Sequence, residues 1–442
     1  MHYHAFRRLI PAAAIVCVVA SACHRSRHHG ATTLRITGIC PLLADGSRQQ
    51  LYAGDPTTGH VVAVSTTNGQ PVRSSVAGNA VAGMALDRCY DQLFAALPDE
   101  QGIAVLDLRS FRRIARLGLG APTYALASGW EDHVIAVTTR GLLDVGVDDF
   151  TTRTLQADVD PHAIVCSDRR GSRAWLIQSV DDAIAVSRFE LSTDAPPATS
   201  VPSSLQGRSI GACASFDADR VYVGTDGEDG IYVLDGETLA KLGSIGVGPD
   251  LVSLAVNATG TRMYVSRGGG LVESLNLDTY ARGRDLFAAS DVTERGLIVA
   301  PNNQSLFVTG SDESLSAYPL FDVRIDMPTV LRIGQCGALT LDGTPLAPWF
   351  MFANSMPGYL YVDAPQSEDP RFFDLACDTG FVLLFSGRFD AAGHAEIPFH
   401  ITPDYAAPSE VVLQAAELPR RGRANLRISN PLAVQILART CR

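Results

Sequence analysis

Pairs of acidic residues recur in four loops of this sequence. Each pair begins six or seven residues after the start of a short apolar segment that we expect to be a strand. A ring of carboxylates would concentrate negative potential and attract a small cationic ligand, a basic peptide or Ca²⁺. Acidic residues are also ordinary in solvent-exposed hairpin loops, so both interpretations stay open. The pairs are Asp99 with Glu100, Asp181 with Asp182, Glu228 with Asp229, and Asp312 with Glu313.

His162 is a second candidate residue, for acid–base catalysis. An imidazole acts as a general acid or base when a neighbouring group orients it. No such partner is identified by spacing, so a histidine in a turn is the simpler interpretation. Ser209 lies in a G-x-S-x-G pattern, but that motif works on a strand-to-helix elbow, and here a loop leading to a strand is expected. The sequence therefore assigns no catalytic residue.

Composition excludes several classes of protein. The 442 residues carry a formal net charge of −11, which argues against nucleic acid, whose phosphates need a basic surface. Lys241 is the only lysine among 36 basic residues, which disfavours Schiff-base and P-loop chemistry. No cysteine pattern fits structural zinc. We expect no cofactor, with Ca²⁺ as the one candidate.

Nine cysteines are present, and they give no fixed pairing. Cys166 and Cys213 occupy matching positions in neighbouring segments, so they either face each other or act as small buried hydrophobes. In the last third of the chain, Cys336, Cys377 and Cys441 are candidates for one disulfide.

The first residues have the order of an export signal. Two arginines precede the apolar run Leu9–Ala20, and small residues follow it. The run is too short to span a bilayer. Cleavage after Ala22 would leave Cys23 at the new N-terminus, as in a bacterial lipobox, although Ala20 departs from the usual leucine. We predict a signal peptide over residues 1–22, lipidation of Cys23 and a tether over 23–31; plain secretion is the alternative.

A repeat of about 42 residues fills the middle of the chain. Only 19% of residues are charged, while Gly and Pro number 39 and 24, which favours an all-β fold. Four antiparallel strands in each ~40–45 residues is the period of a β-propeller blade, so seven units predict seven blades over residues 32–321. Residues 32–36 are placed to complete the last blade. The repeated strands are Leu51–Ala53, Leu93–Ala95, Val134–Ala136, Ala174–Leu176, Val221–Val223, Met263–Val265 and Leu306–Val308.

Strands such as Val221–Val223 and Met263–Ser266, with the turn Asn257–Gly260, resemble YVTN-type β-propeller repeats over about residues 32–325. The resemblance implies the fold. It does not imply one function, because similar propellers serve as lactonases, lyases, surface proteins and scaffolds. Lyase-type propellers place a catalytic histidine on the face that holds His162, together with a metal-binding carboxylate that has no matching residue here.

After Pro319 the period breaks, and residues 322–442 predict a β-sandwich of seven or eight short strands. The stretches Phe385–Ala395 and Ile428–Pro431 resemble a C-terminal module of exported bacterial proteins. We therefore expect an exported, lipid-anchored, non-catalytic binding or structural protein of the bacterial cell envelope, whose partner is an envelope protein or a small cationic ligand. A lactonase- or lyase-like enzyme acting at the acidic loops is the alternative.

Overall fold

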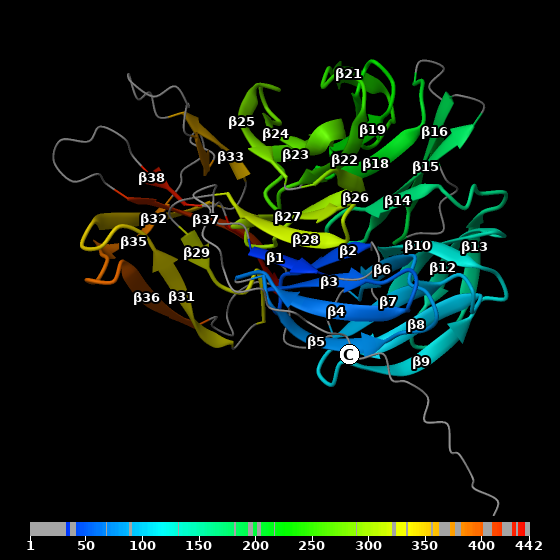
Figure 1. Cartoon of the computed structure of the whole chain (residues 1–442), viewed down its shortest axis with the longest axis horizontal. Coiled ribbons are helices and arrows are strands. Elements are labelled where there is room, and N and C mark those ends of the chain that lie inside the picture. Colours follow the sequence, from blue (N-terminus) through cyan, green and yellow to red (C-terminus); the bar gives the residue numbers. More distant parts are fainter. Residues whose placement is uncertain are drawn as a thin grey trace, which may run out of the picture.

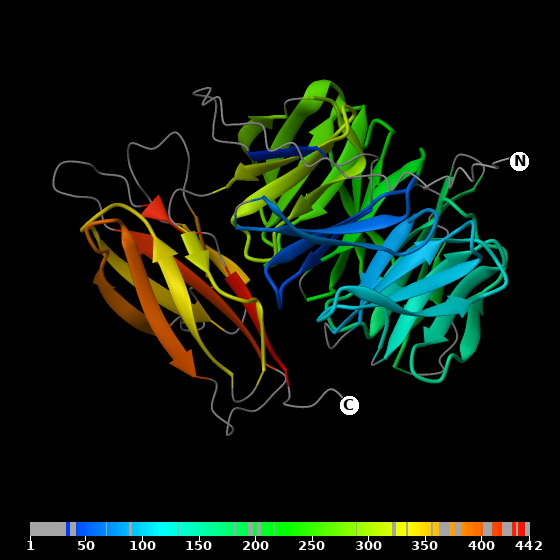
Figure 2. The ribbon, with the colours of Figure 1, turned by 60° about the horizontal axis from the view of Figure 1, so that its bottom comes forward.

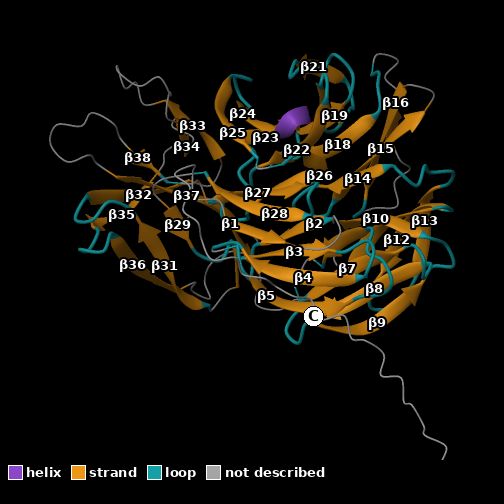
Figure 3. Ribbon diagram, viewed as in Figure 1, coloured by secondary structure: helices purple, strands orange, loops and turns teal. Residues whose placement is uncertain are grey.

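The computed structural model describes residues 32–437 except 36–40, 68, 88–90, 131, 181–182, 193–197, 201–204, 216, 289, 321–323, 333–334, 355–356, 362–371, 376–381, 401–408, 418–426 and 430–431. The predicted signal peptide, Cys23, the tether and the pair Asp181 with Asp182 lie outside the described residues. Nearly all regular structure in the described part is strand (Figure 3), and its single helical element is the 3-10 turn η1 (Gly268–Gly270). None of the described helices is long and apolar enough to cross a bilayer.

Seven four-stranded antiparallel sheets make up most of the molecule, as the repeat predicts (Figure 1). In six of them the order of strands across the sheet follows the chain. Blade 1 contains β2 (Leu42–Asp45), β3 (Gln50–Gly54), β4 (His60–Ser65) and β5 (Pro71–Val76). Blade 2 contains β6 (Gly83–Leu86), β7 (Gln92–Leu97), β8 (Gly102–Asp107) and β9 (Arg112–Gly118). Blade 3 contains β10 (Thr123–Ser128), β11 (His133–Thr138), β12 (Gly141–Gly146) and β13 (Thr152–Gln156).

The next three blades repeat this order. Blade 4 contains β14 (Ile164–Ser167), β15 (Arg173–Val180), β16 (Ala183–Glu190) and β17 (Ala198–Ser200). Blade 5 contains β18 (Ser209–Ala214), β19 (Arg220–Thr225), β20 (Ile231–Asp235) and β21 (Lys241–Ile245). Blade 6 contains β22 (Leu251–Val256), β23 (Arg262–Arg267), β24 (Leu271–Asn276) and β25 (Arg282–Phe287).

Blade 7 takes its outer strand from the other end of the propeller sequence. Its inner strands are β26 (Val292–Val299), β27 (Ser305–Gly310) and β28 (Ser314–Pro319), and β1 (Thr32–Arg35) pairs with β28 in antiparallel register, with Thr32 opposite Ala317. In Figure 2 the dark blue β1 lies in the yellow-green blade. The prediction that residues near the N-terminus complete the last blade is therefore confirmed.

The second strand of each blade could be predicted from the sequence because it is buried and therefore apolar along most of its length. Strands such as β7 and β19 are buried along almost their whole length, because neighbouring blades cover both of their faces. The outer strand β5 instead alternates between half-buried and exposed residues. Each blade shares an apolar cluster with its neighbour, and Leu51 and Val64 of blade 1 pack with Phe307 and Leu315 of blade 7, which closes the circle.

A tight turn between the first and second strands recurs from blade to blade. Asp87 Oδ1 accepts hydrogen bonds from the backbone N–H groups of Asp91 and Gln92, each at 2.8 Å. Asn257 Oδ1 takes the same role in blade 6 with Thr261 and Arg262, at 2.9 and 3.0 Å. These side chains replace backbone partners in the turn. Burial raises the pKa of the Asp87 carboxyl from 3.8 to about 6.

The C-terminal unit is a β-sandwich, as predicted. One sheet has the order β29 (Arg324–Asp326), β31 (Cys336–Asp342), β36 (His394–His400). The other has the order β30 (Val330–Arg332), β39 (Leu432–Leu437), β37 (Ser409–Glu417), β32 (Pro348–Asn354), β35 (Val382–Arg388), with β38 (Arg427–Ile428) paired to β37. β33 (Pro357–Tyr361) pairs with β34 (Phe372–Leu375). Both larger sheets contribute to one core around Leu341, Trp349 and Leu432.

The eleven described strands of this unit exceed the seven or eight expected from the sequence. Five of the eleven have only two to five residues, as in β30 and β38. Alternation of apolar and polar residues cannot be recognised over so short a segment.

The sandwich contacts the face of the propeller formed by the loops between first and second strands. Thr329 donates its backbone N–H to the Gly46 carbonyl at 2.8 Å, and a Cβ at Gly46 would stand 2.0 Å from the Thr329 hydroxyl oxygen. Glycine is therefore required there for close approach. Gln304 Nε2 also donates to the carbonyl of Ile325 at 2.6 Å.

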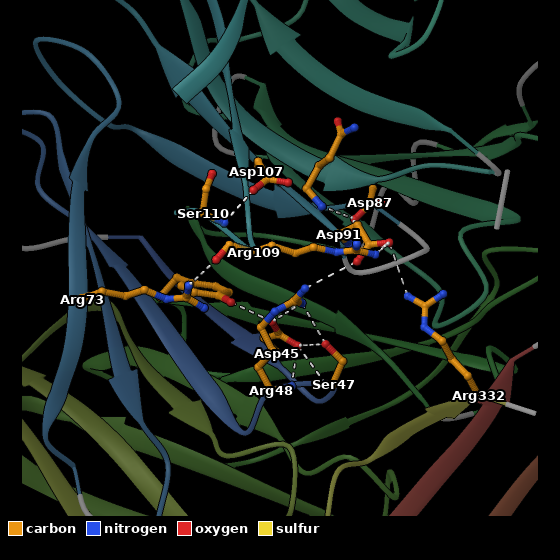
Figure 4. A network of polar contacts seen from close by, with 12 residues as sticks. Asp45, Ser47, Arg48, Arg73, Asp87, Asp91, Asp107, Arg109, Ser110 and Arg332 are labelled. Carbon is orange, nitrogen blue, oxygen red and sulfur yellow. Dashed lines mark hydrogen bonds and ion pairs between the residues drawn. The ribbon is translucent and has the colours of Figure 1, made fainter. Parts of the chain in front are cut away.

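A cluster of charged side chains lies at the same interface and links its parts (Figure 4). The Asp91 carboxylate lies 3.5 Å from guanidinium nitrogens of Arg48 and Arg332, and 3.8 Å from one of Arg109. Arg332 belongs to the sandwich, whereas Arg48 and Arg109 come from blades 1 and 2. Arg48 also reaches the fully buried Asp45 at 3.2 Å. One carboxylate thus joins two blades and the C-terminal unit.

Removal of residues 1–35 is expected to open the ring, because β28 would lose its outer partner. We expect the melting temperature to fall by about 5 °C or more, with association through the uncovered edge of β28. Removal of residues 1–28 alone is the matched control and should leave the melting temperature unchanged. Calorimetry and light scattering measure both effects. Equal melting temperatures for the two truncations would show that packing alone closes the ring.

Asp87→Asn is expected to stabilise the protein at neutral pH. The unfolded carboxyl ionises near pH 3.8 and the folded one near pH 6, so the folded state holds the proton more tightly. Stability contributed by the protonated form is present below pH ~4 and is lost as pH rises towards ~6. Since asparagine keeps the acceptor, we expect a gain of about 3 kcal/mol at pH 7 and little below pH 4. Denaturant titrations across this pH range measure the gain.

The reciprocal change, Asn257→Asp, provides the comparison within the same chain. It places an ionisable group in the equivalent turn and should lower stability at pH 7 more than at pH 4. A pH-independent effect of Asp87→Asn would contradict the assignment.

Candidate functional site at the mouth of the propeller channel

Two sets of loops share one face of the propeller, which we call the mouth face. They are the hairpins between second and third strands and the connections that enter each blade. Contacts between the two sets establish this. Glu100 Oε1 accepts the N–H of Asn79 at 3.1 Å, and Asp312 Oδ1 accepts the hydroxyl of Ser290 at 2.9 Å. The sandwich contacts the opposite face.

A bulge in the inner strand of blade 7 carries side chains into this face. Val292 pairs with Gly310 and Leu297 pairs with Val308, so the four residues 293–296 of β26 lie opposite the single residue Thr309 of β27. β26 therefore contains three extra residues at this point, which form a bulge. Leu297 N–H donates to the Ser253 hydroxyl of blade 6 at 3.2 Å, which fixes the end of the bulge. Arg295, within it, has a φ of 58°, a left-handed conformation unusual for a residue with a side chain.

The bulge makes contacts across the channel. Arg208 of blade 5 lies with Nη1 3.2 Å from Glu294 Oε1. Arg295 donates from Nη2 to the backbone carbonyl of His162 in blade 4, at 3.3 Å. Blades 4 and 7 are not neighbours in a ring of seven, so this contact spans the axis. We call His162, Arg208, Glu294 and Arg295 the mouth cluster.

The charge of Arg295 is held in a partly desolvated position. Burial lowers the pKa of the Arg295 guanidinium below its usual value; Glu294 opposes the shift and Arg208 adds to it. The guanidinium nevertheless stays protonated at all ordinary pH values. By its accessible surface Arg295 is an exposed residue, so solvent also reaches its side chain. The mouth cluster therefore keeps two cations close together.

The acidic pairs predicted from the sequence are partly engaged within the protein. The Glu100 carboxylate lies 3.4 Å from Arg116 Nε and 3.9 Å from Arg113 Nη1. Asp229 lies 3.6 Å from the ammonium of Lys241. In both hairpins the neighbouring outer strand supplies the cation, which reduces the negative potential of the loop.

Asp312 serves its own turn. Its carboxylate accepts the hydroxyl of Ser314 at 2.5 Å in addition to that of Ser290, and the hydrogen bond from Ser314 is the largest cause that lowers the pKa of Asp312. The remaining described members, Asp99, Glu228 and Glu313, are exposed. The pairs thus do not form a uniform ring among the described residues.

His162 takes part in the mouth cluster through its backbone. Its N–H donates to Asp160 Oδ1 at 2.8 Å and its carbonyl accepts from Arg295. Ser209 lies in β18, where its N–H donates to the Ser179 hydroxyl at 3.1 Å. A strand position, rather than an elbow, agrees with the interpretation that Ser209 is not a nucleophile. In the described part of the chain, no three His, Cys, Asp or Glu side chains gather as metal ligands.

The described cysteines are all free thiols. Cys166 packs in the apolar cluster between blades 4 and 5, and Cys213 packs in the one between blades 5 and 6. Burial raises the pKa of Cys166 to about 12. These two residues therefore act as small hydrophobes. Cys336 is exposed, and the other cysteines of the last third lie outside the described residues.

The amino-acid sequence singled out His162 as a candidate, but it did not single out Arg208 or Arg295. The available signal was the polar run Thr293–Gly296 at a position where other blades begin an apolar inner strand. Such a run indicates a bulge only after the register of the sheet is known.

No protein-family model matches the chain, and no curated protein is similar to it in sequence. Among solved structures, the β-propeller domain of Myceliophteria thermophila Cps50 (Swd1) is similar with a TM-score of 0.55 and 13% identity, covering 66% of this chain and 99% of that one. Hydrazine synthase of Kuenenia stuttgartiensis is similar with a TM-score of 0.54 and 9% identity, over 64% and 96%. At such identities the likeness shows the fold alone, and that fold is a β-propeller.

Proposed function

We propose that this chain is an exported, lipid-anchored, non-catalytic binding protein of the bacterial cell envelope. The order of charged, apolar and small residues before Cys23 supports export and lipidation. Several acyl chains on one cysteine would anchor the protein durably. The propeller would then present its mouth face to a ligand.

The observation that carries the binding role is the convergence of blades 4, 5 and 7 on one point. Arg208 and Glu294 meet at 3.2 Å, and Arg295 reaches the His162 carbonyl at 3.3 Å. The loops that enter blades 4 and 5 and the bulge of β26 bring these groups together from three separate blades, and such a convergence of polar groups is expected of a ligand site. In the part of the chain that the structure describes, the sandwich contacts the opposite face of the propeller.

Binding is favoured over acid–base catalysis by the way His162 is held. Its backbone makes the described contacts, at 2.8 Å to Asp160 and 3.3 Å to Arg295. A catalytic imidazole needs a group that fixes its ring and its tautomer. Among the described residues, His162 is held through its backbone N–H and carbonyl rather than through its ring. The partner would be an envelope protein or a small ligand with cationic groups that reach Asp99, Glu228 and Glu313.

Photo-crosslinking in the native cell tests the binding role. We expect a photoreactive benzoylphenylalanine at His162 to form a discrete adduct, because this exposed residue lies at the mouth. The same group at Ile114, 58% exposed on the outer strand β9, is the matched control and should form none. Gel shift and mass spectrometry of the adduct are the measurements. Equal labelling at both positions would count against a ligand at the mouth face.

Cys23→Ser tests the anchor. We expect the protein to move from the membrane fraction to the soluble fraction, because the acylated atom is lost. Cys336→Ser, which removes an exposed free thiol elsewhere, should leave the distribution unchanged. Fractionation and the intact mass of the mature protein measure the outcome. A mass without acyl groups in the parent protein would refute lipidation.

A further inference from the structure

The two arginines of the mouth cluster differ in how their charge is balanced. Arg208 lies 3.2 Å from Glu294 and 3.5 Å from Asp226, and both neighbours are carboxylates. Arg295, among the described residues, donates a single hydrogen bond, and its acceptor is the neutral carbonyl of His162. A guanidinium carries five N–H donors in a planar fork. Arg295 therefore offers charge and donors that the described protein groups leave unused.

Hydrogen bonds at both ends of the bulge fix the backbone that carries Arg295. Its left-handed φ of 58° is unfavourable for a residue with a side chain and persists only where the surrounding structure holds it. Thr293 and Thr309 share a hydroxyl hydrogen bond of 2.6 Å at one end of the bulge, and Leu297 is tied to Ser253 at the other. These contacts hold the guanidinium at the channel mouth before any ligand arrives, which reduces the cost of binding.

The charges of the cluster contribute little to the stability of the fold. The side chains of Arg208 and Glu294 are 58% and 46% exposed. Exposed ion pairs add little to the stability of a folded protein, because water screens the charges. The ring is closed instead by β1 and by the apolar clusters between blades. Variants at the mouth should consequently fold normally and report on binding.

We propose that the mouth cluster binds the carboxylate of a ligand, with Arg295 as the principal group and Arg208 beside it. This inference rests on the proposed binding function and names the chemistry of the ligand. A carboxylate accepts two parallel hydrogen bonds from one guanidinium, which matches the planar fork. It would also give Arg295 a direct ion pair, which no described carboxylate makes with it, although the charge of Glu294 acts on it from nearby.

The surroundings of the cluster select against polyanions. Glu294 lies within the cluster, Asp250 is an exposed residue of the loop that enters blade 6, and Asp99, Glu228 and Glu313 are exposed on the hairpins of the same face. These carboxylates would repel a second or third negative charge on the ligand. The ligand is therefore a carboxylate whose remaining groups are neutral or cationic, such as the C-terminus of a basic peptide or a small monocarboxylic acid.

Matched probes test this proposal with the full mature protein. Two forms of one N-acetylated pentapeptide of glycine and lysine are titrated into the protein, one with a free C-terminal carboxylate and one with a C-terminal amide. Calorimetry measures the affinity of each form. We expect the acid to bind at least tenfold more tightly than the amide. N-acetylglycine, which carries the carboxylate without the lysines, distinguishes a small acid from a peptide as the source. Tripolyphosphate should compete poorly.

Substitutions of Arg295 test whether this residue causes the preference for the acid over the amide. Arg295→Gln should remove the difference between acid and amide, while Arg295→Lys should keep part of it because the charge remains without the fork. Arg140→Gln is the matched control, since Arg140 is an exposed arginine on the β11–β12 hairpin of the same face. It should leave both affinities unchanged. Thermal unfolding of each variant should match that of the parent protein.

The outcomes separate this proposal from the proposed function. Equal binding of acid and amide, or an acid preference that survives Arg295→Gln, would overturn carboxylate recognition. If the His162 crosslink still formed, the binding function would stand with another ligand chemistry. Tripolyphosphate binding as tightly as the acid would show a general anion site and would overturn the stated selectivity. Absence of both the crosslink and all probe binding would overturn both proposals.

Discussion

A four-stranded sheet with two apolar faces is stable only when other sheets cover both faces, and this constraint organises the molecule. Leucine, valine and aromatic side chains of each second strand, such as Phe94 and Tyr222, are almost fully buried because blades lie on either side. A row of such sheets has two uncovered ends unless it closes. Pairing of β1 with β28, together with the cluster around Leu51 and Phe307, removes both ends.

Closure has a chemical consequence at the axis. Antiparallel strands return each blade to the same two faces, so loops from distant parts of the chain gather around one opening. Arg208 and Glu294 are 86 residues apart in sequence, and His162 and Arg295 are 133 apart, yet both pairs meet there. The bulge in β26 uses this geometry to bring one blade into contact with blades that it does not adjoin.

The C-terminal sandwich uses the other face. Asp91 joins arginines from two blades to Arg332, and the backbone of Thr329 approaches Gly46 closely enough that no side chain fits between them. Buried and half-buried charges of this kind are costly unless each has a partner, and here Arg48 links Asp91 to the buried Asp45. The loops between first and second strands thereby serve to attach the sandwich, and the proposed ligand site lies on the other face of the propeller.

The amino-acid sequence determined the elements that repeat locally. Strand periodicity, blade number and the strands of the sandwich follow from residues close together in the chain, where hydrophobic alternation and turn chemistry act. The closing strand was predicted from the position of residues 32–36 ahead of the first blade, although its partner β28 lies at the other end of the propeller sequence. The mouth cluster did not follow, because the local sequence does not show which loops meet at an axis. His162 was a candidate from the sequence, whereas Arg208 and Arg295 gained a role only when the ring and the β26 bulge placed them together. Likewise, the sequence showed Glu100 and Asp229 as members of two acidic pairs, but it did not show the cations that contact them, which lie on the outer strand of each blade. Contacts between residues far apart in sequence depend on register and closure, and only the tertiary structure fixes those.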